Sequence, residues 1–184
     1  TLLGASSALT DHLVRHPEYW RDVVDATVRE RPELYRVLSE AVTDNSGAEA
    51  YDALRVAYYR QLVQIAAVDL TGDAVEQFPQ ISEALAELAG AAVSDALRSG
   101  RTTVEGSERC RLSVIGMGKC GGRELNYISD VDVIFVAEPA DGVAESDALE
   151  VGGKLAVEVM RACSTSTCSA SRGSATRSSS TSSA

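Results

Sequence analysis

The sequence has few of the residues from which zinc sites and disulfide frameworks are built. Its 184 residues include two histidines, His12 and His16, and four cysteines, none of which forms a Cys-x-x-Cys pair. A structural zinc site needs such ligands at short spacings, so zinc binding is not expected. No disulfide framework or signal-peptide pattern is present either, and this indicates a cytoplasmic protein with reduced thiols.

Basic residues and long apolar runs are also scarce. Lys and Arg together number 17 against 27 for Asp and Glu, which gives a formal net charge of -10. An acidic surface repels a polyanion, so nucleic acid is not expected as a main partner. A nucleotide with its magnesium ion stays possible, because local groups set that contact. The apolar stretches are short and interrupted by charge, so no membrane span is expected.

The chain is expected to be an internal piece of a longer protein. Its first hundred residues carry helical patterns. Apolar residues recur at helical spacing, while proline and glycine mark the boundaries. A proline disfavours helix at the residue before it but suits the first turn of a new helix. The expected helices, which should pack as a bundle, are Leu9–Arg15, Pro17–Arg29, Pro32–Val42, Ala48–Leu70 and a last one from Pro79 to Ser99.

The pattern changes after the polar stretch 101–108. Two β-type runs follow at residues 112–115 and 131–136, and a helix weakened by a glycine pair is expected over 147–162. From residue 163 to 184 the chain holds only Cys, Ser, Thr, Ala, Arg and Gly, a composition that predicts disorder. The abrupt change suggests a shifted reading frame, with a true serine-rich tail as the alternative.

Two aspartates at the start of the second β-type run form the most informative pattern. Asp130 and Asp132 are one residue apart, and side chains at i and i+2 of a strand point to the same face. Two carboxylates side by side repel each other unless a cation lies between them. Magnesium takes carboxylate oxygens and leaves room for phosphate oxygens, so the pair predicts a magnesium site.

A glycine pair before these aspartates adds a second expectation. Gly121 and Gly122 would let a phosphate approach the backbone closely, at the N-terminus of a following helix. Polymerase-β-type nucleotidyltransferases combine a glycine pair with an Asp-x-Asp strand in this order to hold a nucleotide and its metals. Taken alone, an Asp-x-Asp is often a solvated strand edge and a glycine pair is often a turn, but the combination favours the functional interpretation.

A longer motif resembles a known family. The stretch that carries the likeness runs from Met117 through Gly-Lys-x-Gly-Gly-Arg-Glu-Leu-Asn-Tyr-x-Ser-Asp-x to Asp132. It is similar to the signature of the glutamine synthetase adenylyltransferases, bifunctional enzymes with two similar nucleotidyltransferase halves. The segments 6–18 and 65–70 resemble helices of the same family. Met117-Gly118-Lys119 and the Glu-Leu-Asn-Tyr run look more like the N-terminal half, which removes AMP by phosphorolysis and releases ADP.

The resemblance implies roles for individual residues. Asp130 and Asp132 would be catalytic residues and magnesium ligands, and Gly121 and Gly122 would contact the phosphates of ATP or ADP. Ser129 would help there, or serve only as a turn residue. In the same loop, Lys119 would neutralise phosphate charge or be a solvated lysine. Glu124 and Asn126 would brace the loop. Glutamine synthetase would be the partner, with the PII signalling protein as a further possibility.

The chain departs from the family pattern after residue 163. The family supplies a third carboxylate from a later strand, in a pattern resembling Val-Asp-x-x-Leu-Arg-Pro, and nothing like it occurs in the serine-rich tail. An incomplete metal cage binds magnesium weakly, so we expect this chain to be inactive on its own.

These observations give the expected organisation. The fold class is α+β, with a helical region over 1–100, an incomplete polymerase-β-like nucleotidyltransferase palm over 101–162 and a disordered tail over 163–184. The alternatives are a relative of the uridylyltransferase that modifies PII, and a non-catalytic helical interaction module. Lys119 and the Glu124-Leu125-Asn126 run argue against the first, and the module predicts no binding of nucleotide or magnesium.

Overall fold

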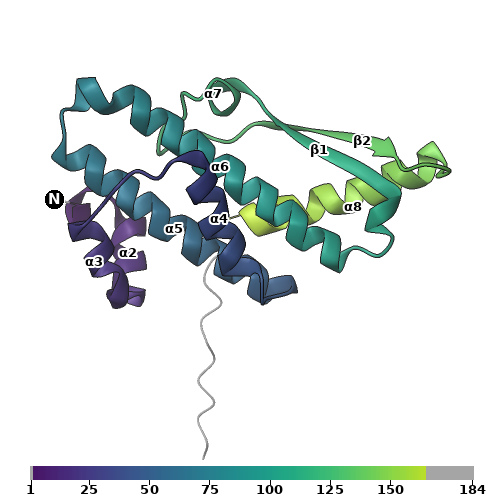
Figure 1. The fold of residues 1–184 in the computed structure, drawn as a ribbon, viewed down its shortest axis with the longest axis horizontal. Coiled ribbons are helices and arrows are strands. Elements are labelled where there is room, and N and C mark those ends of the chain that lie inside the picture. Colours follow the sequence, from purple (N-terminus) through teal and green to yellow (C-terminus); the bar gives the residue numbers. More distant parts are fainter. Residues whose placement is uncertain (1, 165–184) are drawn as a thin grey trace, which may run out of the picture.

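A computed structural model describes residues 2–164 of the chain. Helices dominate it, and one antiparallel pair of strands follows them (Figure 1). The class is therefore α+β, as the sequence predicts. The elements in chain order are α1 (Leu2–Ala5), α2 (Ser7–Arg15), a 3-10 turn (Pro17–Tyr19), α3 (Trp20–Val24), α4 (Arg31–Val42), α5 (Gly47–Thr71), α6 (Ala74–Thr103), a second 3-10 turn (Ser107–Arg109), β1 (Cys110–Gly116), α7 (Gly118–Gly121), β2 (Val133–Pro139) and α8 (Glu145–Cys163).

The long helices α5 and α6 lie side by side and form the axis of the molecule (Figure 1). Helix α4 packs against both of them, and their contact surfaces are rich in alanine, which lets the helix axes approach closely. The largest side chains at the centre, Leu38, Leu54 and Leu88, are at most 2% exposed. Helices α1 to α3 form a smaller cluster that packs on α5 through Val63 and Ala66.

The two strands form a hairpin-like pair in which Cys110 lies opposite Pro139 and Gly116 lies opposite Val133. One face of the pair packs on α8, which also contacts α6. Leu112 and Phe135 point into this side, and the helix presents Val151 and Leu155 to them. The other face is open, so the sheet is covered on one side only.

Glycines in α8 explain how the helix lies so close to the strands. A Cβ on Gly152 would meet the Cβ of Ala137 at 2.9 Å and the Sγ of Cys110 at 3.3 Å, whereas a Cβ on Gly153 would meet nothing within 4 Å. The glycine pair was expected to weaken this helix, yet α8 runs unbroken from residue 145 to 163. Gly152 is therefore needed for packing on the sheet.

Two of the predicted helices have the wrong bounds. The helix expected over 17–29 is a 3-10 turn followed by α3, which ends at Val24. The extended segment after it lets the Arg29 guanidinium reach α5, where Nη1 donates to Gln61 Oε1 at 2.8 Å and Gln64 Oε1 at 2.6 Å. These long-range bonds compete with continued helix, in a stretch of poor helix formers such as Thr27 and Val28.

The helix expected from Pro79 to Ser99 runs from Ala74 to Thr103 instead. Asp73 caps it, because its Oδ1 accepts from the backbone N–H of Val75 at 2.9 Å and of Glu76 at 3.1 Å. Pro79 then lies in the second turn, where its missing N–H leaves the carbonyl of Val75 without a helical partner. Val75 is 86% exposed, so water can satisfy that carbonyl.

No helix among residues 2–164 has both the length and the apolar character that a membrane crossing requires. The predicted disorder of the tail concerns residues that, from 165 onward, lie outside the described part of the chain.

Candidate functional site

The residues singled out in the sequence gather at one end of the strand pair. Residues 117–132, which we call the site loop, leave β1 and return to β2 across that end. The backbone N–H of Met117 donates to the carbonyl oxygen of Asp132 at 2.8 Å, which closes the loop at its base. Gly118 has a φ of +52°, and a Cβ placed on it would lie 3.6 Å from Asp132 Oδ2. The second aspartate of the pair is therefore next to the glycine turn.

The sequence predicted the two aspartates on a strand, and this prediction is wrong. Strand β2 begins at Val133, and Asp130 and Asp132 occupy the coil before it, both exposed. The reason is that β1 ends at Gly116, so no partner strand is available to pair with residues 130–132. The carboxylates therefore lie beyond the end of the strand pair instead of on its face.

The apolar residues between and after the aspartates follow the predicted alternation only in part. Val133 and Phe135 are half-buried on the side that faces the helices, whereas Ile134 is 49% exposed on the open face. In a strand that begins at residue 131, Val131 would share the buried face with Val133 and Phe135, but it is 39% exposed and lines a cavity. Val133 and Phe135 therefore anchor the start of β2, while the two aspartates remain accessible.

The glycine pair lies at the end of a short helix and not before one. Helix α7 covers Gly118–Gly121, and no helix follows it within the site loop, so the expected helix N-terminus after the pair is absent there. The backbone N–H of Gly121 donates to Met117 O and that of Gly122 to Gly118 O, both at 2.9 Å. A Cβ on Gly121 would lie 2.4 Å from the carbonyl oxygen of Gly116, so close packing alone requires a glycine here.

The turn after α7 has the hydrogen bonds of a Schellman motif. Glu124 N–H donates to Lys119 O at 2.8 Å, and Arg123 N–H donates to Cys120 O at 3.2 Å. The residue in the left-handed conformation is Arg123, with a φ of +58°. Glycine is the usual residue at that position, and a side chain there costs about 1 kcal/mol.

Polar side chains inside the site loop hold one another. Lys119 Nζ donates to Ser129 Oγ at 3.4 Å, and Ser129 Oγ donates to Asn126 Oδ1 at 2.8 Å. Asn126 Oδ1 also accepts from the backbone N–H of Ile128 at 3.1 Å. The bracing role expected of Asn126 is therefore present, and the ammonium group of Lys119 lies beside the residue that precedes Asp130.

Three side chains that sequence reasoning did not single out anchor the site loop to the helices. Leu125 is 4% exposed and joins the main helical core. Tyr127 donates its hydroxyl hydrogen to Asp69 Oδ2 on α5 at 3.0 Å, and burial together with that carboxylate raises the pKa of Tyr127. Arg123 reaches α6. The sequence held a signal for this anchoring, because every second residue is involved: Arg123, Leu125 and Tyr127. An extended segment with this spacing presents one side to a neighbour.

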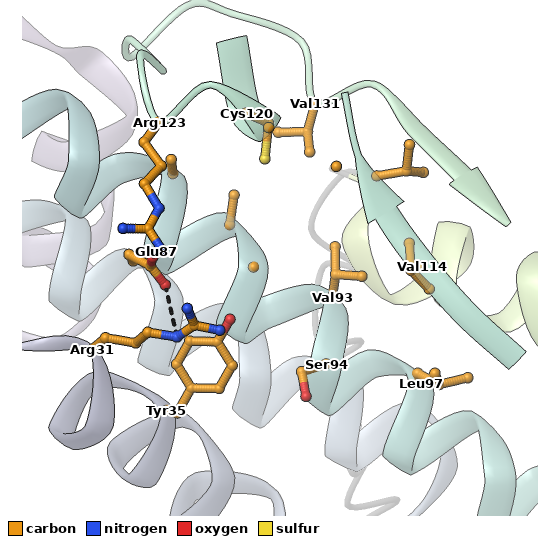
Figure 2. A pocket seen from close by; sticks show the side chains of 16 residues that line it. Arg31, Tyr35, Glu87, Val93, Ser94, Leu97, Val114, Cys120, Arg123 and Val131 are labelled. Carbon is orange, nitrogen blue, oxygen red and sulfur yellow. Dashed lines mark ion pairs between the residues drawn. The ribbon is translucent and has the colours of Figure 1, made fainter. Parts of the chain in front are cut away.

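A cavity of about 530 Å³ lies between the helices and the start of the site loop (Figure 2). Its apolar wall includes Val93, Leu97 and Val114, and its polar end holds Arg31 and Glu87. Asp130 and Asp132 do not line it. The cavity is therefore on the helical side of the sheet, separate from the aspartates.

The thiol and the phenol at the cavity are both protonated groups at neutral pH. Burial is the main cause that raises the pKa of Cys120, and Glu87 adds to it. Burial also raises the pKa of Tyr35, whose hydroxyl would lie 2.8 Å from a Cβ on Gly90. Gly90 thus leaves room for the Tyr35 hydroxyl against α6.

The donor set suits a hard cation only in part. Asp130 and Asp132 offer exposed carboxylate oxygens, the ligand type that magnesium prefers. Within the described residues, however, no three or more His, Cys, Asp or Glu side chains come together as a metal site. The two aspartates therefore fit two positions of a magnesium shell and leave the others to water, phosphate oxygens or further protein ligands.

Comparison with known proteins identifies the family. The family model described as glutamate-ammonia ligase adenylyltransferase matches residues 1–171. The chain belongs to this adenylyltransferase family. Its membership confirms the resemblance drawn from the motif, and the family is one of enzymes.

Curated relatives of the adenylyltransferase family agree. Proteins named bifunctional glutamine synthetase adenylyltransferase/adenylyl-removing enzyme are 46% identical over 171 residues in Streptomyces avermitilis, 44% over 176 in Streptomyces coelicolor and 43% over 169 in Mycolicibacterium smegmatis. The matches cover 90%, 90% and 87% of this chain but 16%, 16% and 17% of the relatives. The chain therefore spans about a sixth of their length. No solved structure matches it.

Proposed function

We propose that the site loop is part of a nucleotidyltransferase site that holds the phosphates of ATP or ADP together with magnesium. The observation that carries the proposal is the closeness of the second aspartate to the glycine turn, since Asp132 Oδ2 lies 3.6 Å from the place that a Cβ on Gly118 would take. Gly118 has no side chain of its own to keep a phosphate away, and a phosphate there would be within reach of the same metal as Asp132. The strand pair and α8 would then be part of a polymerase-β-like palm.

The residues named from the sequence have distinct tasks in this proposal. Asp130 and Asp132 would bind magnesium, which when bound neutralises phosphate charge and aligns the attacking and leaving oxygens. Lys119 would add a positive charge beside Ser129. Gly121 and Gly122 would keep the turn free of side chains. Their own N–H groups already form hydrogen bonds within the turn.

The substrate proposal comes from the relatives. Their printed name says that they adenylylate glutamine synthetase and remove the adenylyl group. We propose that the full protein containing this chain acts on glutamine synthetase in the cytoplasm, and that PII is a regulatory partner. The Met117-Gly118-Lys119 start favours the half that removes AMP, in which an oxygen of inorganic phosphate displaces the tyrosine oxygen at the adenylyl phosphorus and ADP leaves.

Titration calorimetry of ATP and ADP, with and without magnesium, tests the proposal. We expect magnesium-dependent binding that is lost in the double variant Asp130→Asn, Asp132→Asn. A matched control is Asp44→Asn, Asp141→Asn, which removes two exposed carboxylates elsewhere. Because removal of AMP releases ADP whereas attachment consumes ATP, tighter binding of ADP supports the proposed direction and tighter binding of ATP contradicts it.

Absence of binding in the parent chain would contradict the proposal and favour a helical interaction module. Equal binding in the parent and the Asp130→Asn, Asp132→Asn variant would place the nucleotide elsewhere.

A further inference from the structure

The backbone of Arg123 is unusual for its residue type. Among residues 2–164 it is the one residue other than glycine with a positive φ. It follows Gly121 and Gly122 directly, at the position of the Schellman turn where glycine is preferred. A strained backbone that persists at a candidate site calls for a contact of the side chain that compensates it.

That contact joins the site loop to α6. Arg123 Nη1 lies 2.8 Å from Glu83 Oε1, and Arg123 Nη2 lies 3.2 Å from Glu87 Oε1. Glu83 and Glu87 are four residues apart, so their carboxylates stand on one face of the helix. One guanidinium therefore reaches two carboxylates, which fixes its direction better than a single ion pair does.

Glu87 extends the contact to a second helix. Its side chain is 12% exposed, and its other carboxylate oxygen lies 3.3 Å from Arg31 Nε on α4. Figure 2 shows the three side chains in a row at the polar end of the cavity, with Glu87 between the two arginines. This row of Arg31, Glu87 and Arg123, which we call the arginine clasp, connects α4 and α6 with the residue that follows the glycine pair.

We infer that Arg123 is a positioning residue of the nucleotide site. The arginine clasp holds the turn of residues 118–124 against α6, and through that turn it sets where Gly118 lies relative to Asp132. The inference rests on the proposed function and adds to it a means by which helices α4 and α6 act on the site. A shift of α6 against the strands would move the phosphate-binding turn.

The variant Arg123→Gly separates the effect of the side chain from the effect of the backbone conformation. Arg123→Gly removes the clasp but supplies the residue that the left-handed backbone prefers, so the turn itself is relieved of strain. Arg123→Lys is the conservative partner, since it keeps one charge toward Glu83 and Glu87. Both variants leave Asp130 and Asp132 untouched.

Hydrogen exchange of the full chain without nucleotide gives the first readout. If the clasp holds the turn, the amides of Gly121, Gly122 and Glu124 exchange about tenfold faster in Arg123→Gly, and Arg123→Lys restores part of the protection. Unchanged or slower exchange in Arg123→Gly overturns the inference, because it means that the backbone alone maintains the turn. This readout does not depend on nucleotide binding.

Binding of ADP with magnesium gives the second readout. We expect the Kd to rise about tenfold in Arg123→Gly, as for loss of a supporting residue at a metal site, and less in Arg123→Lys. Faster exchange with an unchanged Kd overturns the positioning role. A parent chain that binds no ADP refutes the proposed function and the nucleotide half of the inference, while the exchange result still decides whether the clasp holds the turn.

Discussion

The helical region and the site loop differ in how their structure is held. In the α4–α5–α6 core, Leu38 and Leu88 are fully buried, and the helices supply their own backbone hydrogen bonds. In the site loop only Leu125 is buried, while Ile128 is 93% exposed. The loop depends for its shape on contacts with α5 and α6, so the stable part of the molecule is the support and the exposed part carries the candidate chemistry.

The largest expected effect lies in the helical core. Leu88→Ala would remove a side chain that is 0% exposed, and we expect the free energy of unfolding to fall by about 3 kcal/mol. Urea unfolding followed by circular dichroism measures it. Val75→Ala on the same helix is the control, and should change that free energy by less than about 0.5 kcal/mol because Val75 is 86% exposed. Similar losses in both would contradict the assigned core.

Acid should loosen the helical region at its N-terminal cluster. Burial, with a contribution from His16, lowers the pKa of His12 to about 4, and its Nε2 has no hydrogen-bond partner. The unfolded chain takes up that proton near pH 6.5 and the folded chain only near pH 4. Stability is therefore complete above pH 6.5 and falls by about 3 kcal/mol as the pH drops to 4.

Unfolding curves of His12→Leu and His16→Leu across this range test the assignment. Both variants keep the carboxylates that also titrate with acid, so the difference between them reports the histidine. We expect the fall in stability to be smallest in His12→Leu, whereas His16→Leu should keep most of it, because burial is the main cause of the lowered pKa of His12 and His16 the lesser one. Parallel curves for the two variants would refute the role of His12.

The packing of α8 on the strands can be tested at two neighbouring glycines. Gly152→Ala should lower the free energy of unfolding by about 1 to 2 kcal/mol, because the new methyl group would overlap Ala137 and Cys110. Gly153→Ala should raise it by about 0.5 to 1 kcal/mol, since alanine favours helix and the site is open. The same sign of change in both variants would contradict the close packing of α8 on the strands.

The smallest effect on global stability is expected in the site loop. Tyr127→Phe would remove the hydrogen bond to Asp69, and we expect a loss of about 0.5 kcal/mol in the free energy of unfolding. Hydrogen exchange should nevertheless rise around residues 124–129. Asp69→Asn should act in the same way, and the double variant should add little. Additive effects would mean that the two residues do not act through each other.

The sequence predicted the helical region well where apolar periodicity and punctuation agreed. Helix α2 ends at Arg15 before His16-Pro17, and α5 matches its expected bounds to within one residue at each end. The prediction failed at Pro79, because the cap formed by Asp73 starts α6 earlier than the proline suggests. Local propensity did not reveal which of the two signals would decide the boundary.

The sequence indicated the family of the candidate site but not the shape of the site. The motif from Met117 to Asp132 was enough to indicate the family, but it did not predict that Asp132 lies beside Gly118. The left-handed backbone of Arg123 could not be foreseen, because the contacts that hold it come from Glu83 and Glu87, some 40 residues earlier. Such contacts exist only once α6 and the strands have packed.

The most direct test of the account is to locate the metal. Manganese in place of magnesium, added with ADP to isotope-labelled full chain, broadens the amide signals of nearby residues in nuclear magnetic resonance spectra. The account predicts broadening centred on Gly118 and residues 129–133, with the core of α5 and α6 unaffected, and loss of the effect in the Asp130→Asn, Asp132→Asn variant. Broadening centred elsewhere on the chain, or unchanged in that variant, would contradict it.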